Sequence, residues 1–210
     1  MTEDEQYEEL CDDLGPKLHP IFIRALTTVE RGGTVAQRHN TLLALVKQAM
    51  DFVDPYTPCA KGCSHCCHMA VTVTETEAKR IAAHIGRPFV SQQANLQKLL
   101  SLAGSCDSEE QAMGTAKEWQ KEQIDKWTRV PCVFLEDNAC SIYSVRPLAC
   151  RLYHTIAPSN EPCRLGQAGE RLKEVPQVDM GAFHMAQVMV DPRHEGFGDI
   201  RDWFPEGRKT

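Results

Sequence analysis

The 210-residue sequence has no long apolar run. Nothing in it approaches the roughly eighteen consecutive apolar residues that a membrane-spanning helix requires, so a membrane span is excluded. Its first residues, Met1-Thr2-Glu3-Asp4-Glu5, are acidic, whereas a secretory signal begins basic and then turns apolar. We therefore expect a cytoplasmic protein with no membrane partner.

The sequence also has no surplus of basic residues. Its 23 Lys and Arg face 29 Asp and Glu, which gives a formal net charge of −6. Seven of these acids lie in residues 1–13, which contain no base, so the remainder is close to neutral. The polycationic pattern of a nucleic-acid surface is absent, and we expect no nucleic-acid partner.

Signatures of common catalytic sites are missing as well. The sequence carries no nucleophile–base–orienter set, no glycine loop that would cradle a phosphate and no dinucleotide fingerprint. The Gly32-Gly33 pair lacks the rest of such a motif and is interpreted as a helix break. Without such motifs, the sequence does not indicate a substrate.

Cysteine, in contrast, is abundant, with ten residues. In a chain without an export signal, thiols should stay reduced, so a dense set indicates metal binding or catalysis before disulfides. A first group lies within nine residues: Cys59, Cys63, Cys66 and Cys67. A second, looser group consists of Cys132, Cys140, Cys150 and Cys163. Cys11 and Cys106 stand alone and are expected to be ordinary thiols.

Outside the cysteine-rich segments, the apolar spacing is helical. It predicts helices over residues 16–30, 34–54, 74–85, 88–103, 109–128 and 179–190. Thr34 with Gln37 and Thr74 with Glu77 have the spacing of capping boxes. Residues 132–135 and 140–143 flank a polar turn and are typical of a small β-hairpin, and a Gly/Pro-rich tail follows the last helix.

The expected fold is therefore mainly α: a single helical domain with a small β-hairpin and a cysteine-rich metal-binding lobe. We divide it into three parts. Residues 1–54 form an N-terminal helical segment, and residues 55–165 form the cysteine-cluster metal-binding domain. Residues 166–210 form a C-terminal helix and tail that pack on the same domain.

The spacing of the first cysteine group suits a metal. Thiolates two and three residues apart converge on one point when the backbone curls, and Gly62 permits that curl. Iron–sulfur ligands use comparable short spacings. Since neighbouring side chains point apart, Cys66 and Cys67 either serve different metals, or one binds while the other packs.

The second group is expected to complete the site, with Cys132 and Cys140 on the two arms of the hairpin. Together the predicted ligands are Cys59, Cys63, Cys66, Cys67, Cys132, Cys140 and Cys150. Seven thiols exceed the needs of one tetrahedral ion, which favours a multinuclear centre or spare cysteines for redox or exchange. Nearby basic side chains could offset the thiolate charge: Arg146, Arg151 and Arg164. The nearby histidines, His65, His68 and His154, are expected to support the ligands rather than to bind metal.

These motifs resemble those of the YkgJ-type cysteine-cluster family, a CxxCxxCC zinc- or iron-chelating domain. The resemblance rests on the first cysteine group, Pro131-Cys132, Cys140-Ser141-Ile142-Tyr143 and Arg146-Pro147 with Cys150-Arg151. This sequence has three residues between its first two cysteines, whereas the family motif has two. The resemblance implies a metal cofactor, either Zn²⁺ or an iron–sulfur cluster such as 4Fe-4S. The family includes a flagellin lysine methylase with an iron–sulfur cluster, from which we carry over the metal and not the reaction.

Three classes of function remain open. The first is a metal- or cluster-binding protein with a redox, metal-handling or maturation role, which includes a possible protein partner. The second is a metal-dependent enzyme, by family analogy one that modifies protein lysines. Radical S-adenosylmethionine enzymes share the spacing Cys59-x3-Cys63-x2-Cys66, but no alternating βα pattern follows here. The third is a zinc-stabilised interaction module.

Overall fold

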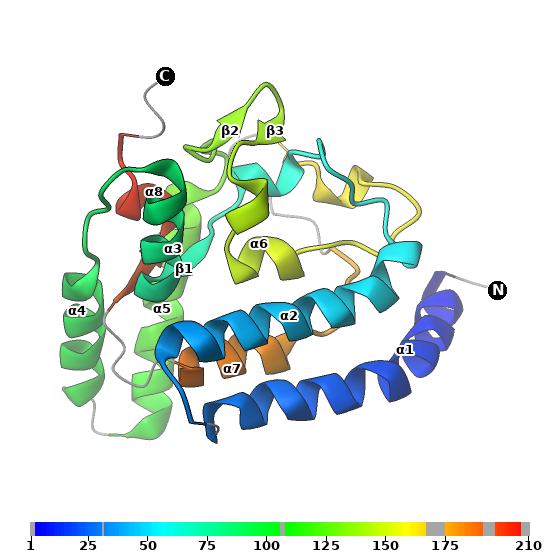
Figure 1. The fold of residues 1–210 in the computed structure, drawn as a ribbon, viewed down its shortest axis with the longest axis horizontal. Helices are drawn as coiled ribbons and strands as arrows, with labels where there is room; N and C mark the ends of the chain where they lie inside the picture. Colours follow the sequence, from blue (N-terminus) through cyan, green and yellow to red (C-terminus); the bar gives the residue numbers. More distant parts are fainter. Residues whose placement is uncertain (1–2, 31, 106–107, 167–174, 191–195, 207–210) are drawn as a thin grey trace. The chain divides into compact units, whose positions relative to one another are not determined.

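The helical prediction is confirmed by a computed structural model, which describes residues 3–30, 32–105, 108–166, 175–190 and 196–206. Helices dominate the described chain, and two small antiparallel sheets accompany them (Figure 1). The chain forms two compact units that interleave along the sequence. Unit 1 consists of residues 1–60, 151–164 and 173–192, and unit 2 consists of residues 61–150, 165–172 and 193–210.

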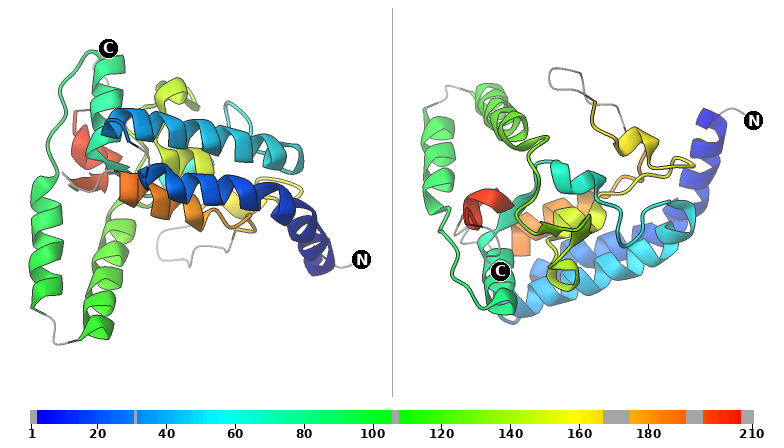
Figure 2. Two further views of the ribbon diagram at one scale, coloured as in Figure 1. Left: turned by 60° about the horizontal axis from the view of Figure 1, so that its bottom comes forward. Right: turned by 90° about the horizontal axis from the view of Figure 1, so that it is seen from above.

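Unit 1 is built on three helices that pack against one another. These are α1 (Glu3–Leu26), α2 (Val35–Val53) and α7 (Gly181–Val190). Figures 1 and 2 show α1, α2 and α7 side by side. Their facing sides bury Leu18, Leu42, Val46 and Phe183, the last in an edge-on contact with Phe22. Short 3-10 turns at Thr27–Glu30, Asp54–Tyr56 and Glu161–Cys163 complete the unit.

Helix α1 begins earlier than the sequence predicts. The expected start was Pro16, but the helix starts at Glu3 and includes both Pro16 and Pro20. An interior proline costs a helix about 3 kcal/mol. The apolar stripe that contains Leu14, Leu18 and Ile21 is buried along this helix, and its packing offsets that cost.

Both predicted capping boxes are confirmed. Thr34 is the N-cap of α2, and Thr74 is the N-cap of α3 (Glu75–Ile85). Each threonine hydroxyl accepts from the backbone amide of the residue three positions on, and that residue's side chain accepts from the threonine amide. Helix α3 ends at Gly86, which has a φ of +67°. Only glycine adopts this left-handed conformation without steric cost, so the predicted end of the helix is fixed locally.

Unit 2 combines the helical pair α4 (Gln93–Gly104) and α5 (Glu109–Trp127) with two short sheets. Strand β1 (Thr72–Thr74) pairs antiparallel with β4 (Phe197–Asp199), and the chain continues into α8 (Ile200–Trp203). The core around them buries Val73, Ile81, Phe134 and Trp203. The sequence predicted only a Gly/Pro-rich tail in this region and did not predict β4, which pairs with a strand far away in the sequence.

The predicted hairpin forms with shorter strands, β2 (Leu135–Glu136) and β3 (Ala139–Cys140). Its turn residues Asp137 and Asn138 have φ values of +48° and +60°. Two successive positive φ angles define the turn that matches the twist of a tight hairpin. The turn Tyr143–Val145 and helix α6 (Leu148–Leu152) follow. Among the described helices, none combines the length and apolar character needed to cross a membrane.

Candidate metal centre

The loop after Lys61 carries most of the first cysteine group. Gly62 has a φ of +99°, a conformation that favours glycine. A 3-10 turn, His65–His68, then contains Cys66 and Cys67. The Cys67 amide donates to the Ser64 carbonyl at 3.0 Å, which closes the turn that carries both cysteines.

Cys132, from the second cysteine group, lies directly beside this turn. The Cys132 amide donates to the Cys67 carbonyl at 2.7 Å, and the Arg129 amide donates to the His68 carbonyl at the same distance. The hairpin register places Cys140 opposite Leu135, three residues after Cys132. Two cysteine segments that are more than sixty residues apart in sequence are therefore in backbone contact within unit 2.

The thiols of Cys66 and Cys67 influence each other. A hydrogen bond from the Cys67 thiol lowers the pKa of Cys66, and the Arg146 guanidinium lowers it further. The same hydrogen bond raises the pKa of Cys67, as do burial and the neighbouring Cys132 and Cys140. One member of the adjacent pair is therefore the more readily ionised.

Three thiols of the second group, Cys132, Cys140 and Cys150, have raised pKa values and stay protonated more strongly than free cysteine. Burial raises the pKa of Cys132 to about 11, with Cys140 adding to the effect. Burial also raises the pKa of Cys140 and, to a greater extent, that of Cys150. Cys66, Cys132 and Cys140 add repulsion at Cys150, so electrostatics links Cys150 to thiols of both segments.

The chemistry of these donors, clustered thiols, suits a thiophilic metal. Close thiolates repel one another, and a bound cation removes that cost because metal binding favours the deprotonated ligand. Arg146, whose guanidinium stacks on the Tyr143 ring at 4.2 Å, supplies positive charge beside Cys66, Cys140 and Cys150. The arrangement, however, is not that of a formed metal site: within the described ranges, no three His, Cys, Asp or Glu side chains make a group that could hold a metal ion.

The remaining predicted ligands are placed differently. Cys63 lies in unit 2 and is partly buried. Cys59 belongs to unit 1 and is exposed, with its amide bonded to the Thr57 hydroxyl at 3.1 Å. Cys163 is buried in unit 1. Cys106 lies outside the described residues, and none of the nine described cysteines forms a disulfide.

Of the three histidines near the motifs, His154 has a structural role. Its Nδ1 donates to the Leu152 carbonyl at 2.6 Å, and its Nε2 accepts from the Val178 amide at 3.0 Å. Both ring nitrogens are therefore used by backbone, and burial lowers the pKa of the ring. His68 contacts the Ser64 carbonyl through Nδ1 at 3.2 Å, which anchors it within the cysteine turn.

The basic side chains near the thiols differ in part from those that the sequence predicts. Arg146 faces the cysteines as expected, whereas Arg164 pairs with Glu161 at 3.1 Å in unit 1. Arg201 was not predicted from the sequence, yet it lowers the pKa of Cys132 and donates to backbone carbonyls of both cysteine segments. No sequence signal marks it, because a single arginine in a tail without a pattern is typical of a solvated side chain.

Glu77 is a second residue whose role the sequence revealed only in part. It is predicted, and observed, as the capping-box residue of α3, where it accepts from the Thr74 amide at 3.0 Å. Its other oxygen accepts from the Leu148 amide at 2.6 Å, at the start of α6. This buried carboxylate therefore fixes the turn that precedes Cys150.

The structure thus defines a mainly α protein whose second unit gathers cysteines from two remote segments beside a β-hairpin. The family model described as "CxxCxxCC: Putative zinc- or iron-chelating domain" matches residues 58–173, more than half of the chain. The chain belongs to this family. The comparisons with curated proteins and with solved structures found no match to this chain.

Proposed function

We propose that this chain is a metal-binding protein whose cysteine thiolates hold an iron–sulfur cluster, with zinc as the alternative occupant. One observation carries the proposal: Cys67 and Cys132, from distant segments, are joined by a 2.7 Å backbone hydrogen bond. Electrostatic interactions of Cys66, Cys140 and Cys150 with one another and with thiols of these two segments support the proposal. Family membership supports zinc or iron.

The number of thiols favours a cluster over a single ion. A structural zinc ion takes four ligands, and its bonds to sulfur are about 2.3 Å long. Five thiols are electrostatically linked in unit 2, and Cys63 precedes two of them, Cys66 and Cys67, on the same loop. A cluster uses several thiolates spread around a larger centre, and the others remain for exchange or redox chemistry.

The proposed role is metal handling, electron transfer or help in the maturation of another protein, in a reducing compartment such as the cytoplasm. The thiolates would hold the metal, which would supply redox or Lewis-acid chemistry when bound. Arg146 would balance the negative charge of the loaded site. Reducing conditions keep the cysteines available as ligands rather than as disulfides.

Anaerobic purification, followed by metal analysis and an absorption spectrum, tests this function. We expect bound iron with sulfide and a broad absorption band near about 400 nm, because thiolate-bound iron–sulfur clusters are coloured. Colourless protein with stoichiometric zinc would assign the alternative occupant, since Zn²⁺ has a filled d shell. Protein that retains neither metal under anaerobic, reducing conditions would contradict the proposal.

A further inference from the structure

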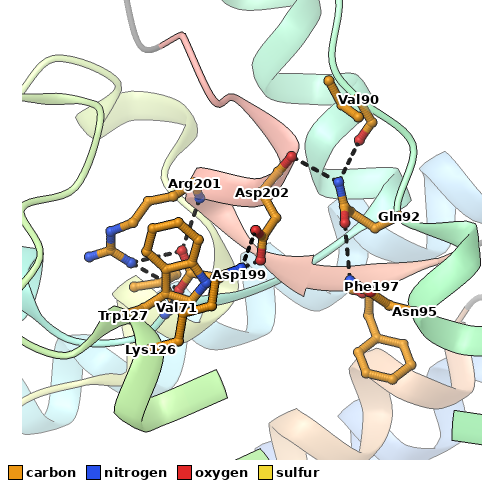
Figure 3. Close-up of polar contacts among 10 residues, drawn as sticks. All are labelled: Val71, Val90, Gln92, Asn95, Lys126, Trp127, Phe197, Asp199, Arg201 and Asp202. Carbon is orange, nitrogen blue, oxygen red and sulfur yellow. Dashed lines mark hydrogen bonds and ion pairs between the residues drawn. The ribbon is translucent and has the colours of Figure 1, made fainter. Parts of the chain in front are cut away.

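A buried ion pair in the C-terminal part of unit 2 contacts both cysteine segments. Arg201 and Asp199 are each about 2% exposed in their side chains, and Arg201 Nη1 lies 2.7 Å from Asp199 Oδ1. Figure 3 shows the guanidinium turned toward this carboxylate, with Val71 and Trp127 close by. Both charged residues lie beyond the family match, which ends at residue 173.

Arg201 donates to the first segment through its Nη2 atom. This atom donates to the Met69 carbonyl at 3.0 Å and approaches the Cys67 carbonyl at 3.5 Å. Asp199 adds a third contact, because its Oδ2 accepts from the Val71 amide at 2.7 Å. The ion pair therefore contacts the backbone of residues 67–71 through three polar interactions.

The same guanidinium donates to the second segment. Nη2 donates to the Val130 carbonyl at 2.6 Å, and Nε donates to the Pro131 carbonyl at 3.3 Å, immediately before Cys132. With Nη1 bound to both oxygens of Asp199, the donors of Arg201 all face acceptors. A lysine has three donors on one atom and cannot reproduce this planar pattern.

The guanidinium is further held in place from one side. Its carbon lies 5.4 Å from the centre of the Trp127 ring. The Trp127 indole N–H donates to Asp202 at 3.1 Å, and Lys126 pairs with the same carboxylate at 2.9 Å. The end of α5 therefore supports α8, which carries Arg201 (Figure 3).

From these contacts we propose that Arg201, seated on Asp199, is a positioning residue for the metal centre. It holds residues 67–71 and 130–132 side by side, so that thiols of both segments reach the same metal. The inference rests on the proposed function and deepens it. It assigns to the C-terminal tail a role in metal affinity, because groups that orient ligands typically change affinity by about 10- to 100-fold.

The test compares full-length variants for the affinity of Zn²⁺ or Fe²⁺, each offered alone in competition with a chromophoric chelator under anaerobic, reducing conditions. Arg201→Lys keeps the charge and loses most carbonyl contacts, and we expect affinity to fall about tenfold or more. Asp199→Asn keeps the shape of the acceptor and should give a smaller loss. The double variant Arg201→Met with Asp199→Asn removes both buried charges together and should match or exceed the Arg201→Lys loss.

Trp203→Phe is the matched control for unfolding. Trp203 lies on the same helix, and the variant loses a buried hydrogen bond to the Val73 carbonyl, 3.1 Å long, while the hydrogen bonds of Arg201 to the cysteine segments are kept. Its metal affinity should stay within about twofold of the wild type. An Arg201→Lys affinity within twofold of wild type, or an equal loss in Trp203→Phe, would overturn the positioning role. Wild-type protein that binds neither metal would instead refute the proposed function itself.

Discussion

Different interactions stabilise the interior of each of the two units. Unit 1 is ordered by long helices with apolar faces, and its buried His154 satisfies backbone groups on both sides. In unit 2, the cysteine segments have little regular structure. The backbone of these segments is instead held by hydrogen bonds with three polar side chains: Arg201, Asp199 and Glu77. The comparison indicates that unit 1 is ordered mainly by apolar packing between helices, whereas the cysteine segments depend on specific polar contacts and on the proposed metal.

The largest expected difference between the units is their response to metal removal. With metal at about 100 times its Kd, binding stabilises the folded state by about 2.7 kcal/mol. Stripping the metal should therefore reduce the hydrogen-exchange protection of residues 61–70 and 129–150 about a hundredfold. The amides of α2 and α7 should change far less. Equal losses of hydrogen-exchange protection in both units, measured by mass spectrometry, would contradict this expected difference.

A smaller effect is expected at His154 in unit 1. Replacement by Phe leaves the Leu152 carbonyl and the Val178 amide without partners in a buried site, which costs about 1–3 kcal/mol. The cost should appear in urea unfolding of the metal-free protein at neutral pH. Metal content should stay at the wild-type level, because both ring nitrogens are already used by backbone.

The same residue predicts a pH dependence with a definite sign. Burial lowers the pKa of His154 in the folded state below its ordinary value of 6.5. The unfolded chain then binds more protons, so the stabilisation is complete above pH 6.5 and is lost as the pH falls toward the folded-state pKa. In the His154→Phe variant, the slope of unfolding free energy against pH should be shallower between about pH 7 and 5. A variant with the wild-type slope would contradict this assignment.

The sequence predicted those parts of the fold that depend on neighbouring residues. Both capping boxes need only a threonine and a partner three residues on, and the hairpin turn at Asp137-Asn138 tolerates positive φ. Features set by distant contacts were missed. The pairing of β4 with β1 and the burial of Arg201 become visible only when remote strands meet. The extension of α1 through Pro16 likewise depends on tertiary packing.

For the candidate site, the sequence predicted the type of ligand and the two cysteine groups that supply it. A dense set of reduced cysteines indicates metal binding or catalysis. The structure brings Cys66, Cys67, Cys132, Cys140 and Cys150 into mutual influence. That all seven predicted cysteines bind metal stays a prediction. Spacing could not reveal the residues that position the thiols, because Arg201 acts on backbone carbonyls and such contacts require no sequence pattern.

The most direct measurement is the metal content of two matched double variants of the full-length chain, purified anaerobically. Cys66→Ser with Cys67→Ser removes thiols of the first segment, and Cys132→Ser with Cys140→Ser removes thiols of the second. Since both segments are proposed to supply ligands to one centre, each variant should lose most of its bound metal, while Cys11→Ser should retain it. Full occupancy in the Cys132→Ser, Cys140→Ser variant would contradict a shared centre.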